Sequence, residues 1–200
     1  LPVRAGSRRV VNKNTKIFHN EQSLLDIKVH QLVQLDFIDE VIISTDSKEI
    51  LDAYWPDKVS VVIRQQDLCR DKTKTIDLIR HAIESYEFEN LIWTHVTSPF
   101  FTTSDYELAW KKFSSLIDYD SLMTVTPIKG YCSFEGLNLN FGYNSDYWPA
   151  TQELTPILEV NSACFILSKA TAHTSMNRVG DKPYLFECDE IKGFDIDYPF

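Results

Sequence analysis

The stretch Val41-Ile42-Ile43-Ser44-Thr45-Asp46 decides the fold class that we expect for this chain. A short run of β-branched apolar residues that gives way to polar ones is typical of a buried strand and its end. Asp46 is expected to cap the next helix, with Glu49 three positions later completing a capping box. Three further runs have the same strand character: residues 59–63, 91–93 and 122–125, the last closed by Pro127.

Helical patterns lie between these strands. Apolar spacing of three and four predicts an amphipathic helix through Ile76, Ile79, Ala82 and Ile83. Ser104 and Glu107 form a second capping-box pattern, which precedes an apolar series of Leu108, Trp110, Phe113 and Leu116. Alternation of strands and helices is typical of an α/β sheet protein. Leu1-Pro2 is expected near the end of a first strand, and a later apolar run, residues 163–167, is expected to return to the core.

Composition limits the function classes. Two hundred residues with 44% hydrophobic content fit one globular domain, residues 1–200, with a sizeable core. No apolar run is long enough to cross a bilayer, so no membrane partner is expected. The net charge of −9 argues against a nucleic acid polymer, because duplex binding needs an extended basic face. The four cysteines and five histidines are dispersed, which disfavours zinc and predicts reduced thiols in a cytoplasmic protein.

The opening loop reverses this acidic character. The first sixteen residues hold five cationic side chains and no carboxylate: Arg4, Arg8, Arg9, Lys13 and Lys16. Gly6 allows a tight turn and a close approach to a ligand, and Ser7 offers a hydroxyl. Arg4 can form a two-pronged contact with phosphate oxygens, while Lys13 acts as a point charge. The loop therefore predicts a phosphate site in a nucleotide-binding protein; the alternative is a solvated basic turn.

Residues 130–158 have a different character from the rest of the chain. Six aromatic residues lie among many Asn, Gly and Ser residues: Tyr131, Phe134, Phe141, Tyr143, Tyr147 and Trp148. This pattern favours an irregular hairpin excursion over a βα unit. Dense aromatic surface is typical of subunit interfaces, so the excursion predicts a homodimer contact. The alternative, weighed equally, is a loop packed on its own domain.

Polar clusters fall where predicted strands end. They are the loop 4–14, Ser44-Thr45-Asp46 and His95-Val96-Thr97-Ser98, and ligands of open α/β sheets bind beyond the carboxyl ends of strands. Near the end of the sequence, Asp195 and Asp197 flank Ile196, so both carboxylates would share one face of an extended strand. Two adjacent carboxylates suit Mg²⁺. The alternative is an Asp-x-Asp sequence at a solvent-facing turn.

Together these segments resemble the N-acylneuraminate cytidylyltransferase family. Residues 1–14, LPVRAGSRRVVNKN, are similar to the family's opening I-P-A-R-x-G-S-K-R-x-x-x-K-N motif. Five shorter matches follow in family order: Ser44-Thr45-Asp46, Arg64 with Leu68, Asp71 and Thr75, Thr97-Ser98-Pro99, Asn161-Ser162-Ala163 and Asp195-Ile196-Asp197. The matches run from Leu1 to Asp197, almost the whole chain.

The resemblance implies a fold and a reaction. The fold would be a Rossmann-like mixed, mostly parallel sheet flanked by helices, of the nucleotide-diphospho-sugar transferase type, with residues 130–158 as a β-rich dimerisation excursion. The reaction would couple CTP to an acidic, sialic-acid-like keto sugar through attack of the anomeric hydroxyl on the α-phosphorus, giving a CMP-sugar and pyrophosphate. The general base stays open between a metal-polarised hydroxyl, Asp197 and His95.

The resemblance also assigns residue roles. Arg4 and Lys13 would contact the triphosphate and act as the catalytic cations, in a loop supported by Gly6, Ser7 and Arg8. Cytidine would be held by Asn14, Arg64 and Thr75. Asp195 and Asp197 would carry Mg²⁺. The sugar would meet His95, Thr97 and Gln152.

Two departures from the family pattern concern the sugar. The family usually has Gln before T-S-P and Arg soon after it, where this chain has His95 and Phe101. The family's excursion commonly carries an Arg before its Gln, but Thr151-Gln152 follows Ala150, and no Arg occurs between Arg80 and Arg178. Lys129 is a candidate to replace the missing arginine. These departures leave three alternatives open: a different nonulosonic acid, a glycosyltransferase, and a nucleotide-binding homologue without a sugar site.

Overall fold

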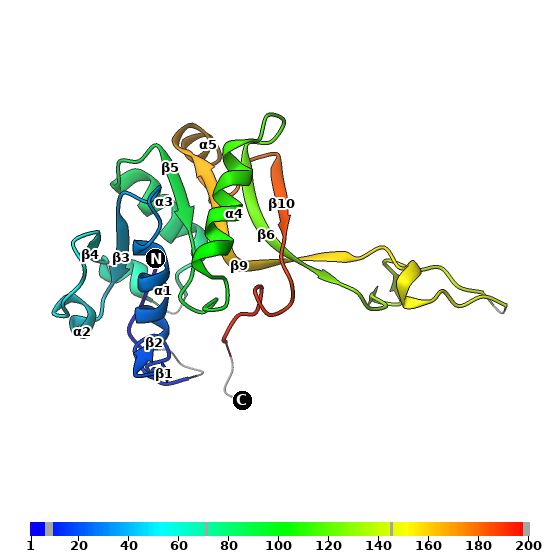
Figure 1. Cartoon of the computed structure of the whole chain (residues 1–200), viewed down its shortest axis with the longest axis horizontal. Helices are drawn as coiled ribbons and strands as arrows, with labels where there is room; N and C mark the ends of the chain where they lie inside the picture. Colours follow the sequence, from blue (N-terminus) through cyan, green and yellow to red (C-terminus); the bar gives the residue numbers. More distant parts are fainter. Residues whose placement is uncertain (7–9, 71, 145, 198–200) are drawn as a thin grey trace.

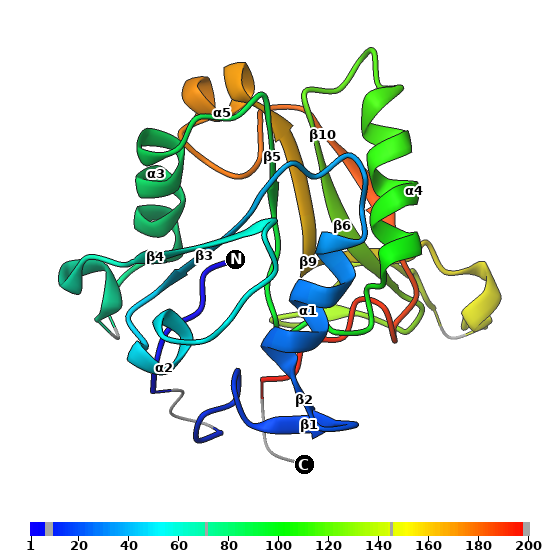
Figure 2. The same cartoon turned by 60° about the vertical axis from the view of Figure 1, so that its left-hand side comes forward.

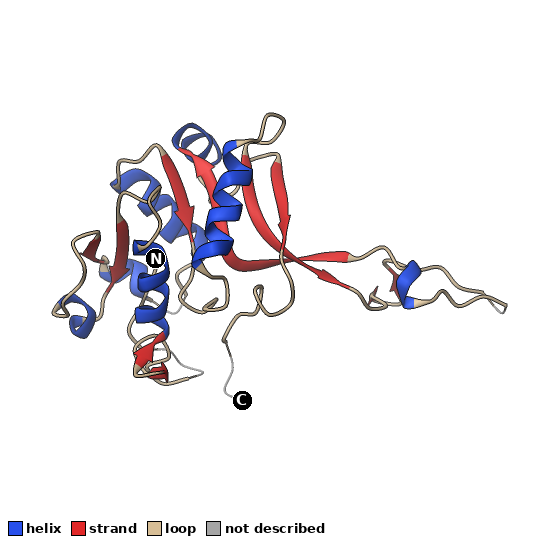
Figure 3. Ribbon diagram, viewed as in Figure 1, coloured by secondary structure: helices blue, strands red, loops and turns tan. Residues whose placement is uncertain are grey.

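The fold is built on a mixed sheet covered by helices on both faces. A computed structural model of the chain describes residues 1–6, 10–70, 72–144 and 146–197. Four strands pair in the order β10 (Pro183–Glu187), β6 (Ser121–Ile128), β9 (Ile157–Ser168) and β5 (Asn90–Trp93) (Figures 1 and 3). β3 (Val41–Thr45) pairs with β4 (Val59–Ile63), and Pro2 forms a bridge to Ser44.

Both strand directions occur in this arrangement. β6 and β10 run parallel, as do β3 and β4, and Pro2 meets Ser44 in parallel. β9 runs antiparallel to both of its neighbours, β5 and β6. The expected α/β class with a mixed sheet flanked by helices is confirmed. The division of the chain into one domain stays a prediction.

Alternating side chains of β9 build the core on both faces of the sheet. Cys164 and Ile166 pack in the cluster that contains Tyr106 and Leu32, from α4 (Thr103–Ser114) and α1 (Leu24–Val33). Phe165 points to the opposite face, where it packs in a cluster with residues of α3 (Thr75–Ser85) and α5 (Lys169–Ser175). This alternation is what an extended strand buried on both faces requires. Figure 2 shows α1 and α4 on one side of the sheet and α3 and α5 on the other.

The remaining elements are short. They are β1 (Ile17–His19), β2 (Gln22–Ser23), α2 (Lys48–Leu51), β7 (Ser133–Phe134), β8 (Leu137–Asn138) and two single-turn 3₁₀ helices, η1 (Gln66–Cys69) and η2 (Thr151–Glu153). A cavity of about 400 Å³ lies between the two sheet segments, with Val41, Ile42, Leu91 and Ile92 among its walls. None of the described helices is both long and apolar enough to cross a membrane.

Two predicted helix caps are wrong. α2 begins after Ser47, and the carboxylate of Asp46 instead accepts the backbone N–H of Ala5 at 2.7 Å. α4 begins after Thr102, which forms a capping box with Asp105, so the predicted Ser104 cap lies within the helix. In both cases a nearby residue can also serve as the cap: Ser47 follows Asp46, and Thr102 lies two positions before Ser104. For α2 the tertiary contact of Asp46 with Ala5, which spacing does not reveal, decides between them. For α4 the local capping box of Thr102 with Asp105 decides.

Pro127 does not end its strand, contrary to the prediction. β6 continues to Ile128, with Pro127 opposite Leu158 of β9. Pairing with β10 stops at Val125, so beyond that point β6 has a neighbouring strand on one side only. A proline lacks the backbone N–H, and it is tolerated where no neighbour on that side needs the donor.

The excursion projects away from the body of the molecule. β6 and β9 continue outward as a two-stranded ribbon, which ends in the β7–β8 hairpin and η2 (Figure 1). Its rings pack on one another: Tyr131 lies 5.3 Å from Trp148, and Tyr143 lies 5.0 Å from the same ring. Trp148 and Tyr143 are 57% and 58% exposed. The hairpin excursion is present where it was expected, and packing against its own domain is not what the described residues show.

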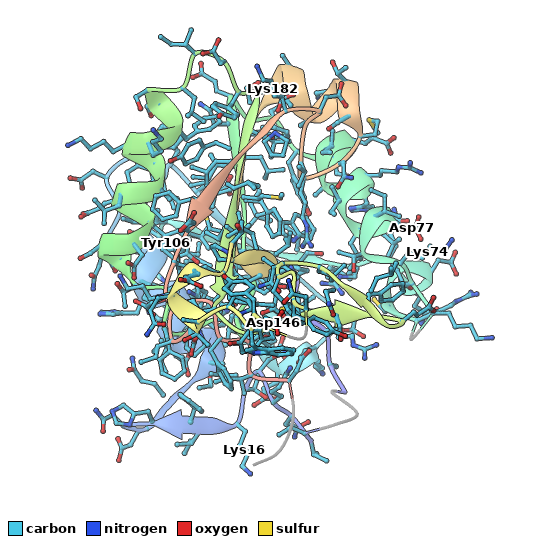
Figure 4. All side chains as sticks on the ribbon, turned by 90° about the vertical axis from the view of Figure 1, so that its right-hand side faces the viewer. Lys16, Lys74, Asp77, Tyr106, Asp146 and Lys182 are labelled. Carbon is cyan, nitrogen blue, oxygen red and sulfur yellow. The ribbon has the colours of Figure 1, made fainter. Side chains whose placement is uncertain are left out.

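A lysine is buried in the core between α1 and α4. Lys28 is 0% exposed, and its Nζ donates to the Phe101 carbonyl at 3.0 Å and to the Tyr106 hydroxyl at 3.1 Å. Tyr106 in turn lies 2.6 Å from Thr94 Oγ1 (its place on α4 is labelled in Figure 4). Burial lowers the pKa of Lys28 from 10.5 to about 7.

This shift predicts how stability depends on pH. Between pH 7 and 10.5 the unfolded chain keeps the Lys28 proton while the folded chain has lost it, so the free energy of unfolding rises with pH. The slope from one such group is at most about 1.4 kcal/mol per pH unit. Urea unfolding of the wild type and of Lys28→Met at pH 7, 8 and 9 should give a difference that grows in favour of the wild type. Parallel pH profiles for the two proteins would contradict this assignment.

Candidate functional site

Several of the predicted site residues lie where strands β3, β4 and β5 end. The opening loop lies beside the end of β3: Val3 donates to the Ser44 carbonyl at 2.9 Å, and Ala5 donates to Asp46. The loop and the segment after β10 meet at the lower end of the molecule in Figures 1 and 2. This is the edge at which ligands of open α/β sheets bind.

The opening loop has the backbone geometry that its glycine suggests. Gly6 has φ +71°, and no atom of the described residues lies within 4 Å of a Cβ added there. Arg4 is half-buried, and its carbonyl accepts Asn14 Nδ2 at 3.5 Å. Lys16, at the end of the loop, projects from the lower edge of the molecule (Figure 4). Ser7 and Arg8 lie outside the described residues, as does Arg9.

Lys13 joins the opening loop to the last described segment. Its Nζ donates to the Ile196 carbonyl at 2.7 Å and to Asp197 Oδ1 at 2.8 Å. The Lys13 side chain is only 12% exposed, so this ion pair is better shielded than a surface pair. The basic loop and the segment with the paired aspartates thus meet in one place.

Asp195 and Asp197 form a carboxylate pair with one unsatisfied oxygen. Oδ1 of Asp195 is buried and has no hydrogen-bond partner in the described parts of the chain. Burial raises the pKa of Asp195, and the charge of Asp197 adds to this effect. Hydrogen bonding with the Thr97 and Ser162 side chains and the charge of Lys13 oppose it. A buried oxygen without a donor, beside a second carboxylate, fits a hard cation such as Mg²⁺. The described residues contain no cluster of three or more His, Cys, Asp or Glu side chains that could hold a metal ion.

A buried polar network fixes the turn that precedes these aspartates. Asn161 on β9 donates to Thr126 Oγ1 at 3.0 Å and to Cys188 Sγ at 3.2 Å, and it accepts from Thr124 at 2.6 Å. Gly193 packs directly against this network, since an added Cβ would lie 2.1 Å from Thr126 Oγ1. The segment then turns toward β5, where Ile196 donates to the Thr97 carbonyl at 2.8 Å. A close backbone approach of this kind is available only to glycine.

Arg64 lies at the end of β4, as predicted, and faces β3. It is 4% exposed, and it donates from Nε to Ser44 Oγ at 3.2 Å and from Nη2 to the Ser44 carbonyl at 2.5 Å. Burial lowers the pKa of Arg64. Thr75 is the exposed first residue of α3, and no contact of the described residues joins it to this group. The roles of Arg64 and Thr75 toward cytidine stay predictions.

The three predicted sugar residues are not together in one protomer. His95 and Thr97 follow β5, beside the site. Gln152 lies in η2 on the projecting excursion and is exposed, with only Thr151 within hydrogen-bond distance of its side chain. Phe101 is completely buried and packs edge-on against the Tyr106 ring, at 4.8 Å, so its side chain belongs to the core.

His95 is held by a residue that sequence reasoning did not find. Trp93 Nε1 donates to His95 Nε2 at 3.0 Å, and Arg178 Nη1 lies 3.0 Å from the same nitrogen. Burial, followed by the charge of Arg178, lowers the pKa of His95 to about 3. The only signal for Arg178 in the sequence was its position as the first arginine after a long stretch without one.

Comparison with known proteins shows which family this chain resembles. The family model described as "Cytidylyltransferase" matches residues 1–133. The N-acylneuraminate cytidylyltransferase of Escherichia coli is 26% identical over 212 residues, which cover 98% of this chain and 48% of that protein. The CMP-N,N'-diacetyllegionaminic acid synthase of Legionella pneumophila is 30% identical over 106 residues, which cover 50% of this chain and 45% of that protein. The chain thus spans about half the length of these curated relatives.

A solved structure supports the same fold. A CMP:2-keto-3-deoxy-manno-octonic acid synthetase, in complex with CTP, superposes with a TM-score of 0.71 at 14% identity and covers 99% of this chain and 91% of that one. The family model covers the opening loop with Lys13 and the ends of β3, β4 and β5, which are the elements that meet at the carboxyl edge of the sheet. On these grounds the chain belongs to the cytidylyltransferase family.

Proposed function

We propose that this chain forms a CTP-dependent nucleotidyltransferase centre that couples CTP to an acidic nonulosonic sugar and releases pyrophosphate. The observation that carries the proposal is the junction of Lys13 with Asp197, beside the unsatisfied oxygen of Asp195. The cationic loop could bind the triphosphate, and the carboxylate pair in contact with it could bind the metal ion. The relatives named as cytidylyltransferases and CMP-sugar synthases support this choice of substrates.

The chain's own residues have separate tasks in this reaction. Arg4 and Lys13 would neutralise charge on the triphosphate, which removes the main obstacle to an oxygen nucleophile that approaches an anionic phosphate. Asp195 and Asp197 would hold Mg²⁺, which when bound supplies Lewis-acid stabilisation to phosphate oxygens. Arg64, fixed on Ser44, and Asn14 would hold the nucleoside.

The hydrogen bonds of His95 bear on the identity of the general base. Trp93 and Arg178 are donors only, so Nε2 of His95 accepts and its proton sits on Nδ1. A histidine whose lone pair is already engaged, and whose pKa is about 3, is unsuited to take a proton at neutral pH. We therefore assign His95 a donor role toward the sugar. The proton of the anomeric hydroxyl would pass to Asp197, or to solvent water if a bound Mg²⁺ polarises that hydroxyl.

We further propose that the working form is a homodimer in the cytoplasm. The exposed aromatic rings on the excursion are of the kind that subunit interfaces bury. An excursion that reaches a second copy would carry Gln152 toward the partner's site. Four free cysteines and a CTP substrate fit a reducing compartment that contains nucleotides.

The carboxylate pair gives the direct test of the reaction. Asp195→Asn combined with Asp197→Asn should reduce Mg²⁺-dependent pyrophosphate release from CTP and sugar by about a hundredfold or more. Loss of the metal removes several kcal/mol of transition-state stabilisation, and each tenfold in rate corresponds to about 1.4 kcal/mol. The fold should survive, because burial already disfavours the charged form of Asp195. A coupled pyrophosphate assay across N-acetylneuraminic, legionaminic and pseudaminic acids measures this effect.

Two exposed carboxylates provide the matched control. Asp36→Asn combined with Asp118→Asn removes the same charge at two exposed positions, in the loops that precede β3 and β6, and should leave turnover unchanged. Undiminished turnover in the Asp195/Asp197 variant would overturn the metal assignment. Absence of pyrophosphate release from the wild type with every acid, despite CTP raising the unfolding temperature, would indicate a nucleotide-binding protein without this activity.

The excursion gives the test of the dimer. Tyr143→Ser combined with Trp148→Ser should raise the dimer dissociation constant at least about tenfold, because buried aromatic anchors dominate interface energies. Sedimentation velocity over a range of concentrations measures this constant. Tyr54→Ser, which changes a ring that is 93% exposed on the body, serves as the control and should sediment as the wild type. A wild type that is monomeric at all concentrations would refute the proposal.

A further inference from the structure

Arg178 is a half-buried cation without a carboxylate partner. Its guanidinium carbon lies 3.9 Å from the centre of the Phe165 ring, and Nη1 contacts His95. Among the described residues no acidic side chain lies within ion-pair distance of it. A partly desolvated guanidinium normally sits opposite a carboxylate or phosphate, because its charge is costly to bury alone. A negatively charged ligand could supply the partner that Arg178 lacks among the described residues.

The contacts of Arg178 fix the orientation and the proton of His95. Indole and guanidinium N–H groups can only donate, so the two donors at 3.0 Å both require a lone pair on Nε2. The proton is consequently on Nδ1, where no hydrogen bond forms within the part of the chain that the structure describes. His95 thus offers one free N–H donor just beyond the end of β5.

This donor lies close to the candidate site. The charges of Asp197 and Lys13 both act on the pKa of His95. Thr97, two residues further on, accepts the N–H of Ile196. Lys13 forms an ion pair with Asp197. No acidic side chain of the described residues forms an ion pair with Arg178.

The loop that carries Arg178 is held firmly in place. Asp120 accepts the backbone N–H groups of Asp181 at 2.8 Å and Lys182 at 3.0 Å, and Gly180 donates to Ser121 Oγ at 3.0 Å. A Cβ added at Gly180 would lie within 2.4 Å of the Asp120 carboxylate. Hydrogen bonds that hold a loop in this way keep the side chain that it carries in a defined orientation.

We propose that Arg178 is a positioning residue for the acidic sugar: it locks His95 so that Nδ1–H donates to an oxygen of the sugar, and its uncompensated charge attracts the sugar's carboxylate. This inference rests on the proposed function and goes further by naming the cation that selects an acidic acceptor. It also accounts for His95 at a position where the family usually has Gln, since the ring accepts hydrogen bonds at Nε2 and donates one from Nδ1.

The test compares an acidic sugar with its uncharged ester. Arg178→Met keeps an unbranched stem on Phe165 but removes the charge and the donor, and Arg178→Lys restores both in part. The probe is whichever of N-acetylneuraminic, N,N'-diacetyllegionaminic or pseudaminic acid the wild type uses with the lowest KM. Its methyl ester is measured as a competitive inhibitor in the same pyrophosphate assay.

The expected result has three parts. Arg178→Met raises the KM for the acid about tenfold to a hundredfold, the range for a lost bond to a charged group, while the KM for CTP changes less than about twofold. The wild type's preference for acid over ester is lost in Arg178→Met and largely recovered in Arg178→Lys. Lys182→Met, which removes a positive charge from an exposed position on the same loop, behaves as the wild type (Figure 4).

Other outcomes overturn the proposal. If Arg178→Met keeps the preference for acid over ester, or weakens CTP and sugar equally, Arg178 is only a packing residue. If the wild type turns over an acid while all Arg178 variants match it, this inference fails and the proposed function stands. If the wild type neither binds nor turns over any of the acids, both fail.

The tautomer of His95 supplies a readout that does not depend on activity. In a long-range ¹H–¹⁵N spectrum of the apo protein at pH 7, His95 should show a protonated Nδ1 and an unprotonated Nε2. Addition of the acid should shift the Nδ1 resonance, and addition of CTP alone should not. A protonated Nε2 would overturn the assignment.

Discussion

The contact of Lys13 with Asp197 and the Ile196 carbonyl is the interaction on which the candidate site depends. One ammonium group holds two segments that lie 184 residues apart, and each segment carries only half of the chemistry. Without this cation, two carboxylates would face each other in a partly buried place. With it, one negative charge is balanced and the other, on Asp195, is left for a ligand.

The sheet makes this junction possible because β9 is inverted. Since β9 runs antiparallel between β5 and β6, it brings Asn161 to the same edge at which β6 presents Thr124 and Thr126. Their hydrogen bonds satisfy every polar atom of a buried amide, and Gly193 packs against that surface. The same strand sends Phe165 to the opposite face, where it forms the floor beneath Arg178. Both the carboxylate pair and the His95 environment therefore depend on the register of one strand.

The sequence predicted the fold class well because apolar periodicity is a local property. Strands at residues 41–45, 59–63 and 90–93 needed no knowledge of their neighbours. Errors arose where two equivalent residues competed, as with Asp46 and Ser47, and a distant partner decided between them. The opening loop and the aspartates were found because their residue types carry an obvious charge pattern.

Arg178 could not be found in this way. It stands among ordinary loop residues, and its importance comes from the clamp of Asp120 on the loop and from the alternation that turns Trp93 and His95 to the same face. Neither is encoded within a short window of sequence. The expectation that the excursion would be either an interface or a packed loop was undecided for the same reason, because only the direction in which the ribbon leaves the sheet distinguishes the two.

The span of the Lys13 contact has a consequence for biosynthesis. During translation, Val3 and Ala5 can form their hydrogen bonds to Ser44 and Asp46 once β3 has emerged, about 40 residues after them. The pocket itself closes only when the residues after Gly193 have left the ribosome, since non-local contacts form late. A nascent chain would thus present Lys13 well before the segment that carries Asp195 and Asp197 could pair with it.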